Sequence, residues 1–242
     1  WNIEKTFEFW QKNFDLGPEK LGKISLFYEP EFVVARENSK YSLLSKVNAS
    51  FFLGTTFFAF YGTSSFEELP LKMNLSVFAH EFGHFIFDYF FAAKEYKTYL
   101  TDKAFSSSQE LSGINEGFAD FCSWLVSKST NPLELSFPFA AEERKIPSRW
   151  TSKQLKDGEV SCRGGFYCKG SVLTSSLYEL SHQKGQDPIK VMKKVLKALP
   201  EFRKDWDQYK NKEGFDYFYL LNRIIEQADE GEEQKLYRRV FA

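Results

Sequence analysis

A single long helix dominates the sequence pattern between Leu71 and about Ala93. Apolar residues recur through this segment at helical spacing, and Gly83 is its only glycine. Pro70, directly before it, suits the first position of a helix. Because a regular helix fixes where its side chains point, polar residues four apart in this segment must share one face.

The polar residues of this helix include one compact motif, His80-Glu81-Phe82-Gly83-His84. The chain has only three histidines, so two of them four residues apart with a glutamate between them is an unusual coincidence. On a helix, both imidazoles can reach one Zn²⁺, and Glu81 can contact a zinc-bound water without ligating the metal. The alternative interpretation is two histidines on a helix surface.

A catalytic zinc ion requires a third protein ligand, and a second predicted helix, from about Gln109 to Lys128, offers one. Ser107 and Glu110 form a capping-box pattern at its start. Glu116 lies among apolar residues of this helix, where an unpaired charge is costly, and is the predicted third ligand. Asp120, one turn further on, can accept the second ring N–H of a ligating histidine; a carboxylate on a solvated face is the alternative.

Strand patterns are confined to the beginning of the chain, and helical patterns fill most of the rest. The chain begins with a predicted helix over 1–15, an extended segment over 24–35, and strands over 47–52 and 55–61 joined as a hairpin. A loop-rich stretch over 130–168 is followed by predicted helices over 170–182, 187–199, 215–228 and 232–241. The sequence therefore predicts an α+β fold in a single domain, 1–242. A small strand-containing N-terminal lobe (1–69) precedes a mainly helical C-terminal lobe (70–242).

Composition excludes several classes of protein. With 242 residues, 43% of them hydrophobic, the chain is neither collagen-like nor disordered. Its 32 Lys and Arg against 33 Asp and Glu leave a net charge of −1, so it has no basic footprint for nucleic acid. No apolar run reaches the ~18 residues of a membrane-spanning helix. The chain has 27 phenylalanines, and those beside the histidine motif either fill the core or line a pocket.

The three cysteines bear on the compartment of the protein. Cys162 and Cys168 flank a short glycine-containing loop and are a candidate disulfide, which would favour an exported protein; two free thiols are the alternative. Cys122 lies in an apolar helical pattern and is expected to be a buried thiol. Since the chain begins at Trp1 and not at Met, we expect it to be trimmed. With the candidate disulfide, we expect an exported protein (periplasmic, cell-envelope or secreted) whose signal is not present in this chain.

The two helical motifs together resemble a known family. The histidine motif followed by Asn-Glu-x-x-x-Asp over 115–120 is similar to the signature of the gluzincins, and specifically of the thermolysin-like zinc metallopeptidases. The resemblance implies a zincin-like fold in which the two histidines of the motif and Glu116 bind Zn²⁺. It also implies that Glu81 is the general base and that Asp120 supports a ligand histidine.

The resemblance extends to a strand before the helix that carries the histidine motif. The run Val-Asn-Ala-Ser-Phe-Phe over 47–52 resembles the family's edge strand, which begins Asn-Ala and binds the substrate backbone. By this resemblance Asn48 and Ala49 contact an extended peptide, for which a strand edge offers N–H and C=O groups. Asn48 as an ordinary turn residue is the alternative.

Two departures from the family concern the spacing of the ligands and the oxyanion. The interval between His84 and Glu116 is longer than in thermolysin, which implies an insertion around 94–108. The family also carries a histidine shortly before a Gly-led helix, which here would begin near Gly170, and this chain has none there. Tyr167 is the nearest substitute, since a phenol can donate to an oxyanion; an ordinary loop aromatic is the alternative.

Three further residues are candidates for the oxyanion donor. His182 lies at the predicted C-terminal end of the helix over 170–182, where its alternative role is that of a cation at a helix end. Tyr96 and Tyr99 follow the helix that carries the histidine motif. The sequence also lacks the clustered Asp and Asn residues of a calcium loop, a further departure from extracellular thermolysin relatives.

The expected function is hydrolysis of peptide bonds by a zinc metallopeptidase, with a peptide or protein as the substrate. Glu81 would deprotonate a zinc-bound water, and Tyr167 or His182 would help zinc to stabilise the oxyanion. Two alternatives stay open. One is a zinc-containing binding protein of the same fold that has lost its activity, because the oxyanion histidine is missing. The other is a helical interaction protein without a metal.

Overall fold

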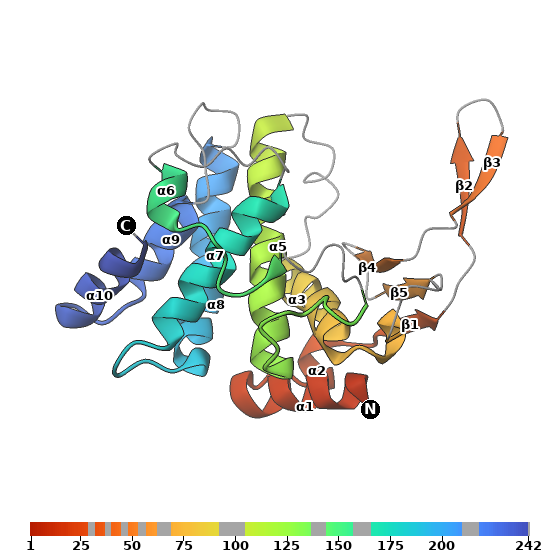
Figure 1. The fold of residues 1–242 in the computed structure, drawn as a ribbon, viewed down its shortest axis with the longest axis horizontal. Helices are drawn as coiled ribbons and strands as arrows, with labels where there is room; N and C mark the ends of the chain where they lie inside the picture. The colour runs from red at the N-terminus through yellow and green to blue at the C-terminus, as the bar shows by residue number, and fades with distance from the viewer. Residues whose placement is uncertain are drawn as a thin grey trace.

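The computed structural model of this chain describes residues 1–28, 32–36, 40–44, 48–52, 57–61, 69–91, 105–136, 144–156, 166–209 and 218–241. Within these ranges the chain is mainly helical, with a small three-stranded mixed sheet near the N-terminus (Figure 1). This content agrees with the predicted α+β class.

The three-stranded sheet contains β1 (Ser25–Tyr28), β4 (Asn48–Phe52) and β5 (Phe57–Tyr61), in the order β1-β5-β4. β4 and β5 pair antiparallel, which confirms the predicted hairpin, whereas β1 runs parallel to β5. β4 is therefore an edge strand of this sheet.

A second sheet has two strands, and the sequence analysis predicted only part of it. β2 (Phe32–Arg36) pairs antiparallel with β3 (Lys40–Leu44). The predicted extended segment over 24–35 thus divides into β1 and most of β2, and β3 was not predicted. The five residues of β3 include no β-branched side chain and one aromatic side chain, so their composition is a weak strand signal.

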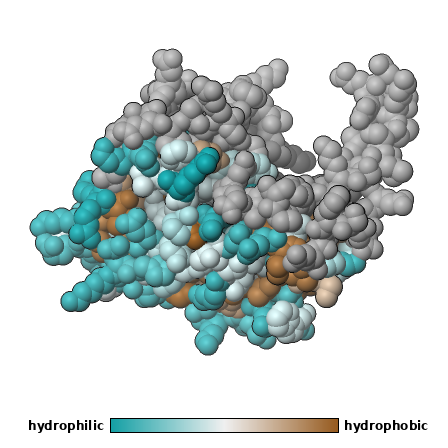
Figure 2. Space-filling model, in the orientation of Figure 1, coloured by the Kyte–Doolittle hydropathy of each residue, from teal (hydrophilic) through white to brown (hydrophobic). Residues whose placement is uncertain are grey.

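Helices form most of the described chain. They are α1 (Asn2–Phe14), α2 (Pro18–Leu21), the 3-10 turn η1 (Leu71–Met73), α3 (Leu75–Phe91), α5 (Phe105–Ser127), α6 (Ser152–Lys156), α7 (Phe166–Ser181), α8 (Pro188–Tyr209), α9 (Phe218–Glu226) and α10 (Glu232–Phe241). Each predicted helix corresponds to one of these. On the face drawn in Figure 2, hydrophilic side chains cover α10, as expected of an amphipathic helix that buries its other face.

The predicted end of α8 at Leu199 is wrong, because the helix continues through Pro200 to Tyr209. Proline in a helix interior costs about 3 kcal/mol. The helix nevertheless buries Phe202 and Trp206 beyond the proline, while Pro200 itself is exposed. Burial of these two aromatic side chains outweighs the lost backbone hydrogen bond.

Glycines bring α3, α5 and α7 into close contact, with α5 between the other two (Figure 1). A Cβ on Gly83 of α3 would lie 2.7 Å from the Cα of Ala119 on α5. A Cβ on Gly117 of α5 would lie 2.4 Å from the carbonyl oxygen of Gly170 on α7. These helix backbones therefore touch at positions that only glycine can occupy.

Substitution of Gly117 by alanine is expected to destabilise the protein. The added methyl group collides with main-chain atoms of Gly170, which cannot move aside as a side chain would. The destabilisation from overpacking exceeds the stabilisation from alanine's higher helix propensity. We therefore expect the free energy of unfolding to fall by about 1 to 2 kcal/mol. Denaturant unfolding measures this loss. A variant as stable as the unchanged protein would show that the helices can separate without cost.

Phenylalanines of α3 attach this helix to the sheet. Phe78, Phe82, Phe85 and Phe87 are all buried, which confirms the core interpretation for these four side chains. The first three have ring centroids within 6.1 Å of that of Phe58 in β5. The packed rings fix α3 relative to the sheet, and with it every polar side chain that α3 carries.

Candidate metal centre

Asn74 determines where α3 begins. Its Oδ1 accepts a hydrogen bond from Ser76 N (2.9 Å), and its Nδ2 donates to Ser136 Oγ (2.8 Å). An asparagine that accepts from the second residue of a helix acts as its N-cap. The predicted start at Leu71 is therefore wrong by about one turn, since α3 begins at Leu75 after this cap.

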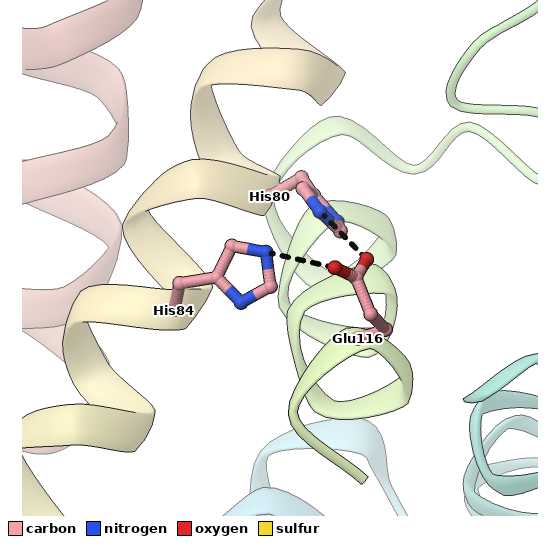
Figure 3. A group of neighbouring side chains, drawn as sticks. All are labelled: His80, His84 and Glu116. Carbon is pink, nitrogen blue, oxygen red and sulfur yellow. Dashed lines mark ion pairs between the residues drawn. The ribbon is translucent and has the colours of Figure 1, made fainter. Parts of the chain in front are cut away.

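Three side chains of α3 and α5 converge into one group. His80 and His84 lie one turn apart on α3 and point towards Glu116 on α5 (Figure 3). The Nε2 of His80 lies 3.4 Å from Glu116 Oε2, and the Nε2 of His84 lies 3.7 Å from Glu116 Oε1. One ligand atom from each residue lies within 4.8 Å of the other two, so the group could hold a metal ion. We refer to His80, His84 and Glu116 as the metal-binding group.

The second nitrogen of each imidazole has an acceptor of its own. His80 Nδ1 lies 2.9 Å from Asp120 Oδ1, and His84 Nδ1 lies 2.9 Å from Asn115 Oδ1. A proton at Nδ1 leaves the lone pair on Nε2, the nitrogen that faces Glu116. Asp120 and Asn115 are therefore placed to hold both rings in the tautomer that a metal ion beside Glu116 requires.

Arg144 belongs to the site and was not predicted from the sequence. Its Nε donates to Asp120 Oδ2 (2.7 Å), and its Nη2 donates to Asp120 Oδ1 (2.6 Å) and to Glu116 Oε2 (3.1 Å). The guanidinium compensates two carboxylates whose burial would otherwise be costly. The apolar surroundings of these carboxylates indicated that a partner was needed. The sequence offered no means of choosing Arg144 among the basic residues of the loop-rich stretch over 130–168.

Burial and charge pairing set the electrostatics of the group. Burial alone would lower the pKa of the His80 imidazole, but hydrogen bonds to Asp120 and Glu116 outweigh it and raise this pKa to about 9. Burial would raise the pKa of the Glu116 carboxyl, but the charges of His84 and Arg144 hold this pKa well below its usual range. Glu116 is thus ionised, as a metal ligand must be, and His80 must release a proton when a metal binds.

Glu81 lies beside this group without belonging to it. Its carboxylate is buried, and its Oε2 accepts a hydrogen bond from the main-chain N–H of Phe51 (2.7 Å). Strand β4, predicted to bind substrate, is therefore hydrogen-bonded directly to Glu81.

The two predicted substrate-binding residues lie on this strand. Ala49 lies two residues before Phe51 and presents its main chain to the same side of β4. Asn48 pairs with Tyr61 of β5, and its side chain lies outside the described residues.

Tyr167 lies in the first turn of α7 and not in a loop, because this helix begins at Phe166 and not at the predicted Gly170. The Cζ of Arg144 is 4.9 Å from the centre of the Tyr167 ring, a distance typical of a cation–π contact. Partial burial and the negative charge of Glu116 raise the pKa of Tyr167. The structure thus brings Tyr167 close to the group.

His182 lies at the other end of α7. It is fifteen residues beyond Tyr167, which corresponds to about 22 Å along a helix. Its Nδ1 is 2.8 Å from the carbonyl oxygen of Tyr178, and its ring lies against Trp124 with the centroids 5.7 Å apart. The structure does not bring His182 together with the metal-binding group. Tyr96 and Tyr99, the other candidate donors, lie outside the described residues.

The cysteines follow the sequence analysis where the structure describes them. Cys168, next to Tyr167, is disulfide-bonded. Cys162, its predicted partner, lies outside the described residues. Cys122 is a free, buried thiol as predicted, and burial raises the pKa of this thiol well above its usual value, so it is unreactive.

Comparisons with known proteins add no assignment: no protein-family model and no curated protein matches this chain. Among the described residues, no helix combines the length and the apolar character needed to cross a membrane. The chemistry of the site is therefore the basis for inferring a function.

The donor set fits zinc. Two imidazoles and one carboxylate are a ligand set of catalytic zinc sites, in which a fourth position is left for water or substrate. Structural zinc sites instead use four protein ligands. In the part of the chain that the structure describes, this group of His, Cys, Asp and Glu residues has three members. Within the described residues, the donor set is therefore compatible with a three-ligand zinc site.

Proposed function

We propose that this chain is a zinc-dependent metallopeptidase with a zincin-like fold, as its resemblance to the thermolysin-like family implies. One observation carries the proposal. His80, His84 and Glu116 lie in one group that could hold a metal ion, and Glu81, on the same helix, is held beside it by an edge strand. A metal site with a neighbouring carboxylate and a strand edge has the parts that peptide hydrolysis requires.

Each part has a role in this proposal. A bound zinc ion would supply a water of lowered pKa and polarise the carbonyl group of the substrate. Glu81 would accept a proton from the attacking water and pass it to the leaving nitrogen, so that one water is consumed and an acid and an amine form. Tyr167 would donate a hydrogen bond to the oxyanion. Asn48 and Ala49 would bind the backbone of an extended peptide.

A zinc-binding protein without peptidase activity is the second candidate function. It is favoured because Tyr167 stands at the start of α7 where the family has a histidine, while His182 lies at the far end of this helix. Such a protein would bind zinc equally well but would cleave no peptide. Cleavage therefore separates the two functions.

Metal removal is expected to abolish peptide cleavage. We expect the purified protein to hold about one zinc ion per chain, because the group offers one set of ligands. Treatment with 1,10-phenanthroline should stop cleavage of a peptide library, and added zinc should restore it. Elemental analysis and mass spectrometry of the digested library provide the two measurements.

A pair of variants controls this experiment. Glu116→Ala should lose zinc and cleavage together, since it removes one of three ligands. Glu179→Ala, on an exposed position of α7, should keep both. Zinc without cleavage would favour the second candidate function, and no zinc even after reconstitution would contradict both.

A further inference from the structure

The carboxylate of Glu81 is held at one oxygen. Oε2 accepts the hydrogen bond from Phe51 N at 2.7 Å. Among the described residues, no hydrogen bond to its other oxygen, Oε1, is found. Because hydrogen bonds are directional, the bond to Oε2 gives this buried carboxylate a defined orientation.

The hydrogen bond from the Phe51 amide to Glu81 does not replace a hydrogen bond between β4 and β5. Phe51 lies opposite Phe58 in the antiparallel ladder between β4 and β5. In such a ladder, opposite residues alternate between pairs that exchange hydrogen bonds and pairs that exchange none. Because the Phe51 N–H points towards Glu81, it points away from β5, and the pair with Phe58 is of the second kind.

The side chain of Phe51 fixes the distance between this amide and α3. It is buried, and its ring centroid lies 5.1 Å from that of Phe58 and 5.6 Å from that of Phe85, one turn after Glu81 on α3. Packed aromatic side chains leave little freedom of movement. Strand β4 and the turn of α3 that carries Glu81 therefore form one rigid unit.

We propose that the main-chain N–H of Phe51 is a positioning group for the hydrolytic reaction. By holding Oε2 of Glu81, it presents Oε1 to the attacking water in the orientation needed for proton transfer. This inference rests on the proposed peptidase function. It assigns β4 a second task besides peptide binding, namely to orient the base.

The sharpest test removes the N–H and leaves the side chain. Incorporation of phenyllactic acid at position 51 replaces the amide by an ester and keeps the phenyl ring. We expect kcat to fall by about 10- to 100-fold, because a misplaced catalytic group costs up to about 10²-fold. KM should change less than about twofold, and the zinc content should stay the same, because the ester alters neither the ligands nor the substrate contacts.

A second pair of variants repeats the comparison with natural residues. Phe51→Pro removes the N–H, and proline is tolerated on an edge strand where its nitrogen faces away from the neighbouring strand. Phe51→Ala removes the ring but keeps the N–H, so it reports the loss of packing alone. We expect kcat of the proline variant to lie about 10-fold or more below that of the alanine variant, with equal zinc content.

Each outcome distinguishes the inference from the proposed function. Equal kcat for the ester and the unchanged protein would overturn the inference while leaving the peptidase function intact. A parallel fall in zinc content and melting temperature would assign the amide a structural role and would also overturn it. Absence of cleavage by the unchanged protein would overturn the proposed function itself, and the inference with it.

Discussion

Glu81→Gln is expected to lower kcat by about 10²- to 10⁴-fold, the range that general-base catalysis contributes. The glutamine amide has nearly the shape of the carboxylate, and its carbonyl oxygen can still accept the hydrogen bond from Phe51 N. It cannot accept a proton from water. Because Glu81 is not a member of the metal-binding group, the zinc content should stay at the value of the unchanged protein.

Zinc analysis and steady-state kinetics on the same preparation measure both quantities. Glu179→Gln is the matched control. Glu179 is exposed on α7, and its substitution removes the same negative charge at a position away from the site. It should have the unchanged rate and zinc content. Cleavage by Glu81→Gln at the unchanged rate would exclude Glu81 as the base. Loss of zinc would show instead that Glu81 helps to hold the metal.

The helices that carry the metal-binding group were predictable because their signals are local. His80 and His84 are four residues apart, and so are Glu116 and Asp120, so helical geometry places each pair on one face. The apolar periodicity around them is long enough to identify both helices. That the two faces meet could be expected only because charged residues in apolar surroundings need partners.

The remaining parts of the site depend on contacts between distant segments. Arg144 lies in a segment without periodic pattern, 24 residues after Asp120, and only the folded chain shows which basic residue reaches the carboxylates. The donor to Glu81 is a main-chain N–H, which every residue except proline possesses, so no side-chain pattern signals it. The start of α7 was misplaced for a related reason, because Gly164 and Gly165 before Tyr167 suggested a loop and Gly170 was taken as the start of the helix.

Asp120→Ala is expected to damage stability and metal binding together. Asp120 is buried, accepts two hydrogen bonds from Arg144 and lies 2.9 Å from His80 Nδ1. Removing one partner of a buried ion pair costs about 3 to 5 kcal/mol. The loss should lie at the lower end of this range, because Arg144 keeps its hydrogen bond to Glu116. Loss of the acceptor that orients a ligand histidine weakens metal binding by about 10- to 100-fold. Denaturant unfolding and competition with a chromophoric zinc chelator measure the two effects.

The chain offers a matched control for this variant in Asp205. Asp205 on α8 also accepts two hydrogen bonds from one arginine, Arg223, at 2.6 Å each, and it belongs to no metal-binding group among the described residues. Asp205→Ala should lower stability by less, because Arg223 is partly exposed and water can solvate it. It should leave zinc affinity unchanged. If both variants lost zinc affinity equally, general loosening of the fold would explain the loss. A fall confined to Asp120→Ala would instead assign Asp120 to the orientation of His80.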